Sequence, residues 1–356
     1  MWIFRIEARR QKSAGRRPGP PTSRYAPIPG TPQMAALTAC CLLLTVYCSM
    51  RAGYGLFAAG GRYEVREVKP GVFVWIPEDI IDQDGDARFG RAGNAGFIIT
   101  SEAVMVVNTT NTPFHARELL YEIRRRTDRP VKYVFNTGSA ADEMLGNEVF
   151  ADLRATIIST PRVQAEMQSY QRELTRDLQD DLKLQARMRG IHPTVPNQTF
   201  DHQTSIQVGS REVRLMAVAG TASSGGSTVY LPDSKVLFLG DLYDNDYFPQ
   251  VGSRDVRGWI ESLRQVETWD VDVYVPGHGI PSGKKELVDF RQFLEWLMAE
   301  VRTRVQEGKT LERVKSELLP IANYHWHGPE LGPSAVEAVY RQLTSSTTTK
   351  AIGATR

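Results

Sequence analysis

The sequence has few of the residues that bind soft metals or cross-link a chain. Its 356 residues include three cysteines and six histidines. The cysteines are Cys40, Cys41 and Cys48, so the chain beyond them needs no disulfide and tolerates an oxidising compartment. Long apolar runs are also missing. The longest, residues 35–48, is shorter than the roughly 20 residues that a membrane-spanning helix needs.

The motifs of several common function classes are absent. The chain has no P-loop, no dinucleotide-binding glycine fingerprint after a strand, and no Gly-x-Ser-x-Gly nucleophile elbow. The formal net charge of +2 arises from the N-terminal region, because residues 1–61 hold eight Lys and Arg residues but one Glu. Residues 62–356 are acidic overall, and we therefore expect no nucleic-acid partner.

The N-terminal region differs in composition from the remainder. Residues 1–33 are basic and rich in proline, with too little apolar surface to offset the entropy of ordering, so we predict a disordered leader. Residues 34–61 join the short apolar run to small residues, which is typical of a signal peptide; an N-terminal apolar anchor is the alternative. We expect an exported protein, periplasmic or secreted, or one that is anchored to a membrane only through this segment. Met34 is an alternative start.

Strand and helix patterns alternate over residues 62–356, which predicts an α/β fold. The Thr-Pro pair at 112–113 marks the start of an amphipathic helix over 113–126, because Thr caps helices and proline fits their first turn. A long helix should end at Gly308, within a C-terminal helical extension over about 284–345. The order of elements predicts two sheets packed face to face with helices outside. Strands are predicted at 72–76, 96–100, 103–108, 131–136, 156–159, 206–208, 213–217, 228–231, 236–239 and 271–275, and further helices around 140–150 and within 161–189.

Five segments resemble, in their order along the chain, the metallo-β-lactamase superfamily. They are GNAGFIITSEAVMVVNTT (93–110), PVKYVFNTGSAADEMLGNEVF (130–150), GTASSGGSTVYLP (220–232), KVLFLGDLY (235–243) and VYVPGHG (273–279). The resemblance covers the chain from about Tyr63 to Leu297. It implies a four-layer αβ/βα sandwich, with His and carboxylate side chains at strand ends that hold two metal ions.

The family's His-x-His-x-Asp-His signature is incomplete here. With Thr137 aligned on the family threonine, Gly138 and Ala140 take the places of the first two His, and Ala222 that of the isolated His. These three side chains offer a metal no donor atom, so the resemblance implies that the first metal site is lost. Asn108 also replaces the Asp that normally closes the first hairpin.

The second metal site keeps three of the family's ligands and has a different residue at the fourth position. Asp142, Asp241 and His278 match the family's ligands, and Glu143 stands where the third His belongs. One imidazole and three carboxylates suit manganese, iron, magnesium or calcium better than zinc. The cofactor prediction is therefore none, or one divalent metal among manganese, iron, magnesium, calcium and zinc.

Two functions remain open on this basis. The first is a pseudoenzyme, noncatalytic or weakly active, that binds a small-molecule ligand or a partner. The alternative is a mononuclear metal-dependent hydrolase that uses Asp142, Glu143, Asp241 and His278. The sequence identifies neither catalytic residues, nor a substrate, nor an oligomeric state.

The remaining candidate groups are interpreted as structural. In His325-Trp326-His327 we expect the Trp to pack and the His residues to lie at the surface, rather than to hold a metal. Residues 241–246 (DLYDND) are interpreted as a solvated acidic loop, with binding of a cation or repulsion of anionic substrates as the alternatives. We also predict that His115 faces solvent. His192 and His202 are expected at the surface.

Overall fold

The computed structural model describes residues 63–78, 92–182, 192–218, 226–318 and 325–353, all within the unit Gly60–Arg356. The predicted leader (1–33) and apolar segment (34–61) lie outside the described residues. Among the described helices, none has the length and apolar character that crossing a membrane requires.

The described strands form a sheet of seven and a sheet of five. The first sheet begins as an antiparallel meander of β1 to β4 and continues with parallel pairs through β5, β6 and β7. Its strands are β1 (Tyr63–Lys69), β2 (Val72–Pro77), β3 (Ala95–Ile99), β4 (Val104–Val107), β5 (Val131–Phe135), β6 (Thr156–Ser159) and β7 (Gln198–Thr199).

The second sheet has the order β12-β11-β10-β9-β8, with β11 and β12 parallel and the other pairs antiparallel. Its strands are β8 (Gln203–Val208), β9 (Arg211–Ala217), β10 (Ser227–Leu231), β11 (Val236–Asp244) and β12 (Val273–His278).

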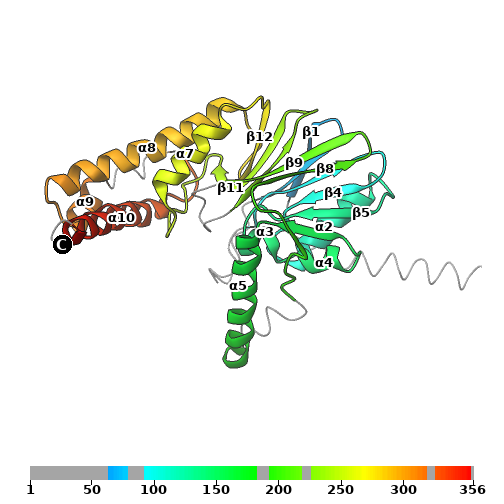
Figure 1. Ribbon diagram of the computed structural model, residues 1–356, viewed down its shortest axis with the longest axis horizontal. Coiled ribbons are helices and arrows are strands. Elements are labelled where there is room, and N and C mark those ends of the chain that lie inside the picture. The colour runs from blue at the N-terminus through cyan, green and yellow to red at the C-terminus, as the bar shows by residue number, and fades with distance from the viewer. Residues whose placement is uncertain (1–62, 79–91, 183–191, 219–225, 319–324, 354–356) are drawn as a thin grey trace, which may run out of the picture. The chain divides into compact units, whose positions relative to one another are not determined.

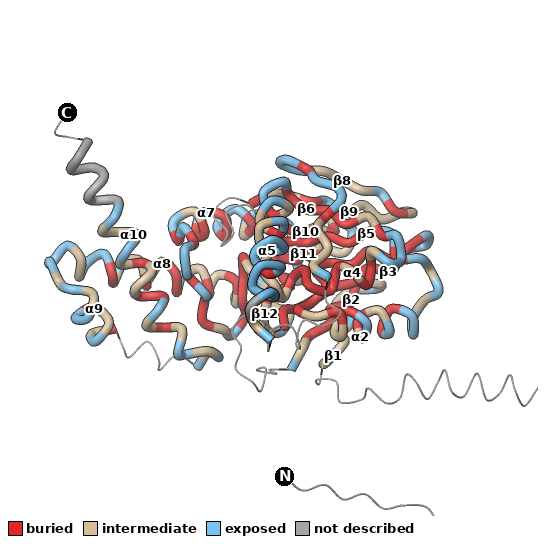
Figure 2. The backbone as a smooth tube through the Cα atoms, turned by 90° about the horizontal axis from the view of Figure 1, so that it is seen from below, coloured by how far each residue is buried: buried red, intermediate tan, exposed pale blue. Residues whose placement is uncertain are grey.

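Successive side chains of each strand point to opposite faces of the sheet, and those on the inner faces form the central core. In β2, Val72 and Val74 face the second sheet, where Val229 and Phe238 belong to the same buried cluster. Side chains on the opposite face, such as Trp75, pack against helices instead. Because successive side chains of a strand point to opposite faces, a strand buried on both faces is apolar throughout, and Figure 2 shows the sheets as the main buried region.

Helices cover the outer face of each sheet, which confirms the predicted four-layer sandwich (Figure 1). Leu119 of α2 packs on the first sheet, whereas Trp259 of α7 and Phe290 of α8 pack on the second. The helices are α2 (Pro113–Arg124), α3 (Ala141–Met144), α4 (Asn147–Ala151), α5 (Pro161–Asp180), α7 (Val256–Val266), α8 (Lys284–Gln306), α9 (Leu311–Leu318) and α10 (Gly332–Gly353), with a 3-10 turn, η2 (Pro329–Leu331).

Local signals fix the predicted helix ends. The Thr112 hydroxyl accepts a hydrogen bond from the backbone N–H of His115 at 3.1 Å, and a proline follows in the first turn. Gly308 adopts a φ of 71° just beyond α8, a conformation that glycine reaches without steric cost.

Strand β1 and helix α7 were not predicted. The N-cap of α7 is Asp255, whose carboxylate accepts from the N–H of Arg257 at 3.1 Å.

Two predictions, one about residues 140–150 and one about His115, are wrong. The single helix expected around 140–150 is two short helices, α3 and α4, separated where Gly146 lies against Thr109; a Cβ on Gly146 would stand 2.0 Å from the Thr109 carbonyl oxygen. His115 is half-buried instead of solvent-facing. Its Nδ1 lies 2.7 Å from Asn111 Oδ1, its ring contacts Trp75, and burial lowers its pKa.

The pH dependence of stability tests the burial of Glu118 on helix α2. Burial, and then the negative charge of Glu122, raise the pKa of Glu118 from 4.5 to about 7, so the folded state holds this proton more tightly than the unfolded state. Stability from this group therefore falls as pH rises from about 4.5 to 7. We expect Glu118→Gln to melt at a higher temperature than the parent at pH 8 but not at pH 4.5. Exposed Glu102→Gln is the control; equal shifts at both pH values would contradict the assignment.

Candidate metal centre

Three of the predicted ligands converge at one edge of the sandwich. Asp142 lies in the first turn of α3, Asp241 lies on β11, and His278 is the last residue of β12. One potential ligand atom from each of these residues lies within 4.8 Å of those of the other two. The sequence positions are far apart, so tertiary structure alone brings these side chains together.

The strand pairing explains the convergence. Because β11 and β12 are parallel, their carboxyl ends lie at the same edge, and the pairing becomes irregular between Gly240 and Asp244. The end of β12 and the turn after it are held by buried Asn94, which directly precedes β3 of the first sheet. Its backbone N–H donates to the Gly277 carbonyl at 2.7 Å, and its Nδ2 donates to the carbonyls of Pro276 at 3.0 Å and Gly279 at 2.7 Å.

Hydrogen bonds orient the three side chains only in part. His278 Nε2 and Asp142 Oδ2 are 3.0 Å apart. Arg254 donates from Nη2 to Asp241 Oδ2 at 3.2 Å and from Nη1 to the Asp241 carbonyl at 2.6 Å, while its guanidinium lies 4.5 Å from the Trp259 ring. Among the described residues, Asp241 Oδ1 and His278 Nδ1 are buried without a hydrogen-bond partner. Buried polar atoms without partners are rare, and a bound cation satisfies an unpaired acceptor such as Asp241 Oδ1.

The electrostatics of the triad are dominated by burial and by its carboxyl groups. Burial and the charge of Asp142 raise the pKa of Asp241, which Arg254 partly offsets. Burial lowers the pKa of His278, but the hydrogen bond and charge of Asp142, together with the charge of Asp244, outweigh it and raise the pKa to about 9. Two carboxylates and an imidazole in this arrangement suit one divalent cation.

Glu143, the fourth expected ligand, does not join this group in the structure. Its carboxyl is not among the atoms that lie within 4.8 Å of one another, and it accepts hydrogen bonds from Thr137 Oγ1 at 2.7 Å, from the N–H of Ala140 at 3.3 Å and from Asn108 Nδ2 at 3.4 Å. The residue is 3% exposed. Burial, followed by the charges of Asp241 and Asp142, raises its pKa well above the usual range of a glutamic acid.

The Glu143 carboxyl occupies the space beside Gly138, the position that matches the family's first His. A Cβ on Gly138 would lie 2.1 Å from Glu143 Oε2. Gly240 leaves room on the other side: its φ is 51°, and a Cβ there would lie 2.2 Å from Thr137 Oγ1 and 2.7 Å from Glu143 Oε1. Ala140 precedes α3 with an extended backbone. Ala222 lies outside the described residues.

Asn108, the residue directly after β4, supports this arrangement. It has a φ of 56°, and its amide both donates to Thr137 Oγ1 at 2.7 Å and accepts from the N–H of Thr137 at 2.9 Å. A carboxylate at this position would lack the donor that Asn108 presents to Thr137 Oγ1. The Asp-to-Asn replacement seen in the sequence therefore fits the buried position of Glu143.

Sequence reasoning missed three residues of the site. Asp244 was interpreted as part of a solvated loop, which is wrong: it is 4% exposed, Oδ1 has no hydrogen-bond partner among the described residues, and burial is the main cause that raises its pKa to about 7. The apolar pair Leu242-Tyr243 next to it was the signal that the strand continues. Asn94 lies in the segment 93–110, which resembles the family, but its role in the site was not predicted. No local pattern marks Arg254.

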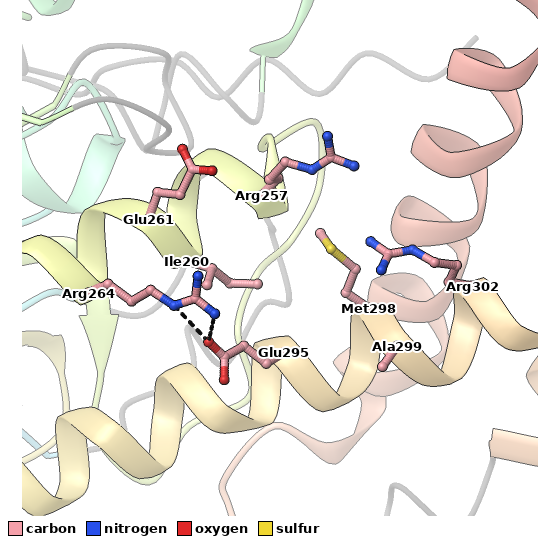
Figure 3. Close-up of a pocket in the computed structure, with 8 residues that line it drawn as sticks. All are labelled: Arg257, Ile260, Glu261, Arg264, Glu295, Met298, Ala299 and Arg302. Atoms are coloured by element: carbon pink, nitrogen blue, oxygen red, sulfur yellow. Dashed lines mark hydrogen bonds and ion pairs between the residues drawn. The ribbon is translucent and has the colours of Figure 1, made fainter.

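A small cavity adjoins the triad at His278. It encloses about 190 Å³ and is lined by Ile76, Pro77, Glu78, Ala92, Asn94, Tyr247, His278, Gly279 and Ile280. A larger groove of about 440 Å³ lies between α7 and α8 (Figure 3), where Arg264 pairs with Glu295. None of the triad residues lines this groove.

The His325-Trp326-His327 segment packs as predicted. The Trp326 ring lies 4.9 Å from that of Phe293 and 5.9 Å from that of Phe248, while both His residues are exposed. His327 forms a β-bridge with Tyr247, and their rings are 4.8 Å apart. This contact links the C-terminal region to the wall of the small cavity. His192 and His202 are exposed, as expected.

The contact between Gly138 and Glu143 predicts a non-additive effect on stability. We expect Gly138→Ala to lower the free energy of unfolding by about 1–3 kcal/mol, because the new methyl group overpacks the Glu143 carboxyl. In the Gly138→Ala, Glu143→Ala double variant that clash is absent. Urea denaturation of the four proteins should therefore give a favourable coupling energy of at least about 1 kcal/mol. Gly283→Ala, where the nearest atom lies at 3.5 Å, is the control. Strict additivity would show that the two positions do not compete for space.

Comparisons with known proteins agree with this geometry. The family model of the metallo-beta-lactamase superfamily matches residues 88–278. The linear primary-alkylsulfatase of Pseudomonas sp. (strain ATCC 19151) is 22% identical over 220 residues; the match covers 53% of this chain and 42% of that protein, so the chain spans less than half of its length.

Solved structures show the same fold. A metallo-beta-lactamase from Pontibacter korlensis has a TM-score of 0.53 at 18% identity, covering 66% of this chain and 99% of that one. The protein TMB-1 has a TM-score of 0.50 at 18% identity, covering 65% of this chain and 97% of that one. Because the family model spans more than half of the sequence, this chain belongs to the metallo-β-lactamase superfamily.

Proposed function

We propose that this protein is a metallo-β-lactamase-fold protein that binds one divalent cation at Asp142, Asp241 and His278 and does not carry out two-metal hydrolysis. The observation that carries this proposal is the position of Glu143, whose carboxyl fills the space beside Gly138. Export through residues 34–61 is part of the same proposal.

The donor set supports one cation. Asp241 Oδ1 is a buried acceptor without a hydrogen-bond partner among the described residues, and potential ligand atoms of Asp142 and His278 lie within 4.8 Å of one from Asp241. Oxygen-rich sets of this kind favour manganese, iron(II), magnesium or calcium over zinc. Manganese is the practical probe because it accepts mixed oxygen and nitrogen ligands.

Loss of the two-metal reaction follows from the residues at the first metal position. Gly138 and Ala140 offer no donor atom, and the nearby Glu143 carboxyl is engaged by Thr137 and by the N–H of Ala140. Two adjacent metals stabilise the attacking and leaving oxygens together, and one metal does not. The protein is therefore proposed to bind a ligand with little or no turnover.

A mononuclear hydrolase is the second candidate. It is favoured by the cavity that opens directly onto His278, beside the proposed cation. A single bound cation supplies Lewis acidity and lowers the pKa of a bound water. We do not propose for this chain the alkylsulfatase activity that the name of the Pseudomonas relative gives, because the match covers 42% of that protein at 22% identity.

Calorimetric titration with Mn²⁺ tests the cation site. We expect about one equivalent to bind the parent, and at a concentration 100 times the Kd the ion should stabilise the fold by about 2.7 kcal/mol. Asp142→Asn and His278→Ala should both lose this binding, and His327→Ala should keep it. Parent protein that binds no Mn²⁺, with a melting temperature unchanged by the metal, would end the proposal.

Hydrolysis of 4-nitrophenyl acetate separates the two candidates. The ligand-binding protein should hydrolyse it no faster with Mn²⁺ than with a chelator. A rate that rises with Mn²⁺ and is lost in Asp142→Asn would favour the mononuclear hydrolase instead.

A further inference from the structure

We infer that the groove between α7 and α8 binds a small phosphate monoester whose organic group is apolar. The groove has a volume of about 440 Å³, which is within the usual range of small-molecule pockets, and residues of both helices line it. None of the triad residues is in this lining, so the inference does not rest on the proposed cation site.

Two arginine side chains in the groove have no internal counter-ion. Arg257 of α7 and Arg302 of α8 are exposed, and neither guanidinium has a hydrogen bond or an ion pair among the residues that the structure describes. Figure 3 shows both side chains extending toward the space beside Met298. Because like charges that share a groove repel each other, an anion that binds between them is stabilised by both.

The other charged groups of the groove leave this position open. Arg264 donates to Glu295 Oε1 from Nη2 at 2.6 Å and from Nε at 3.1 Å, and Arg291 donates to the same oxygen at 2.6 Å. The Glu295 carboxylate is therefore neutralised within the protein. Glu261 is the other carboxylate in the lining, and Figure 3 shows its side chain directed away from Arg302. This end of the groove is therefore positively charged.

The floor of the groove is apolar. Ile260 is 6% exposed, and Met298 is partly buried against the same core cluster. Ala299 also lines the groove and is exposed. An apolar group that covers this floor removes the floor from water, which is favourable. The groove thus combines an apolar surface with a cationic end, and a ligand with one apolar and one anionic part matches both.

The presence of two guanidinium groups favours a phosphate monoester over a carboxylate. A guanidinium presents N–H donors in a planar fork that fits two oxygens of an anion. A carboxylate has one negative charge, whereas a phosphate monoester has three acceptor oxygens and about 1.5 to 2 negative charges at pH 7. The phosphate therefore balances the charge of both Arg257 and Arg302, and a carboxylate balances the charge of one.

Calorimetric titration with phenyl phosphate, without added divalent metal, tests the charged end. We expect Arg257→Gln and Arg302→Gln each to weaken binding about tenfold, which corresponds to about 1.4 kcal/mol. Higher salt should weaken binding to the parent, because the two charges are exposed and therefore screened. Benzoate should bind the parent less tightly than phenyl phosphate does.

Arg172→Gln is the control for these two variants, because Arg172 is exposed on α5 and does not line the groove. It should bind phenyl phosphate as the parent does. All three substitutions are at exposed positions, so the melting temperature without ligand should stay near that of the parent. Parent protein that does not bind phenyl phosphate, an equal loss in Arg172→Gln, or tighter binding of benzoate would overturn the inference.

A comparison with inorganic phosphate tests the apolar floor. Met298→Ala should weaken the binding of phenyl phosphate about fivefold and leave that of inorganic phosphate unchanged, because the ring alone covers the floor. An equal loss for both probes, or a loss for neither, would show that the ring does not lie on Met298 and would contradict the apolar part of the ligand.

The Asp142→Asn variant separates this groove from the cation site. It changes a residue of the triad, and we expect it to bind phenyl phosphate as the parent does. Binding that is lost in Asp142→Asn but kept in Arg257→Gln would place the phosphate at the triad and overturn the inference. If the parent binds no Mn²⁺ but binds phenyl phosphate through Arg257 and Arg302, the cation proposal fails and this inference stands.

Discussion

The buried carboxyl group of Glu143 constrains the rest of the site. It shares the first turn of α3 with Asp142, and successive helical residues point about 100° apart. The helix that directs Asp142 to His278 therefore directs Glu143 toward Thr137. Space for this group exists only because positions 138 and 240 are glycines. The space beside Gly138 is occupied by a hydrogen-bonded carboxyl.

The remaining triad depends on contacts between the two sheets. Asn94, directly before β3, hydrogen-bonds the end of β12, which carries His278, and the N–H of Ser227 donates to the Thr137 carbonyl at 2.8 Å. These bonds cross from one sheet to the other at the edge where the ligands meet. The two sheets thus hold the triad and the cavity beside it at a common edge.

Local sequence patterns predicted most elements because short-range physics controls them. Alternating burial gives β2 its two apolar faces, and Thr112 with the following proline fixes the start of α2. The predictions failed where a distant segment decided the outcome. Burial of His115 requires Trp75 from another element, and the break before α4 requires the backbone of Thr109.

The sequence by itself determined the family, the layered architecture and the loss of donor atoms at positions 138 and 140, because motifs and residue types are local properties. It also named Asp142, Asp241 and His278. Only the tertiary structure decided that these three converge while the Glu143 carboxyl is hydrogen-bonded to Thr137, and that Asp244 is buried. The direction of a side chain and its distance from water depend on packing against residues far along the chain, which no local pattern encodes.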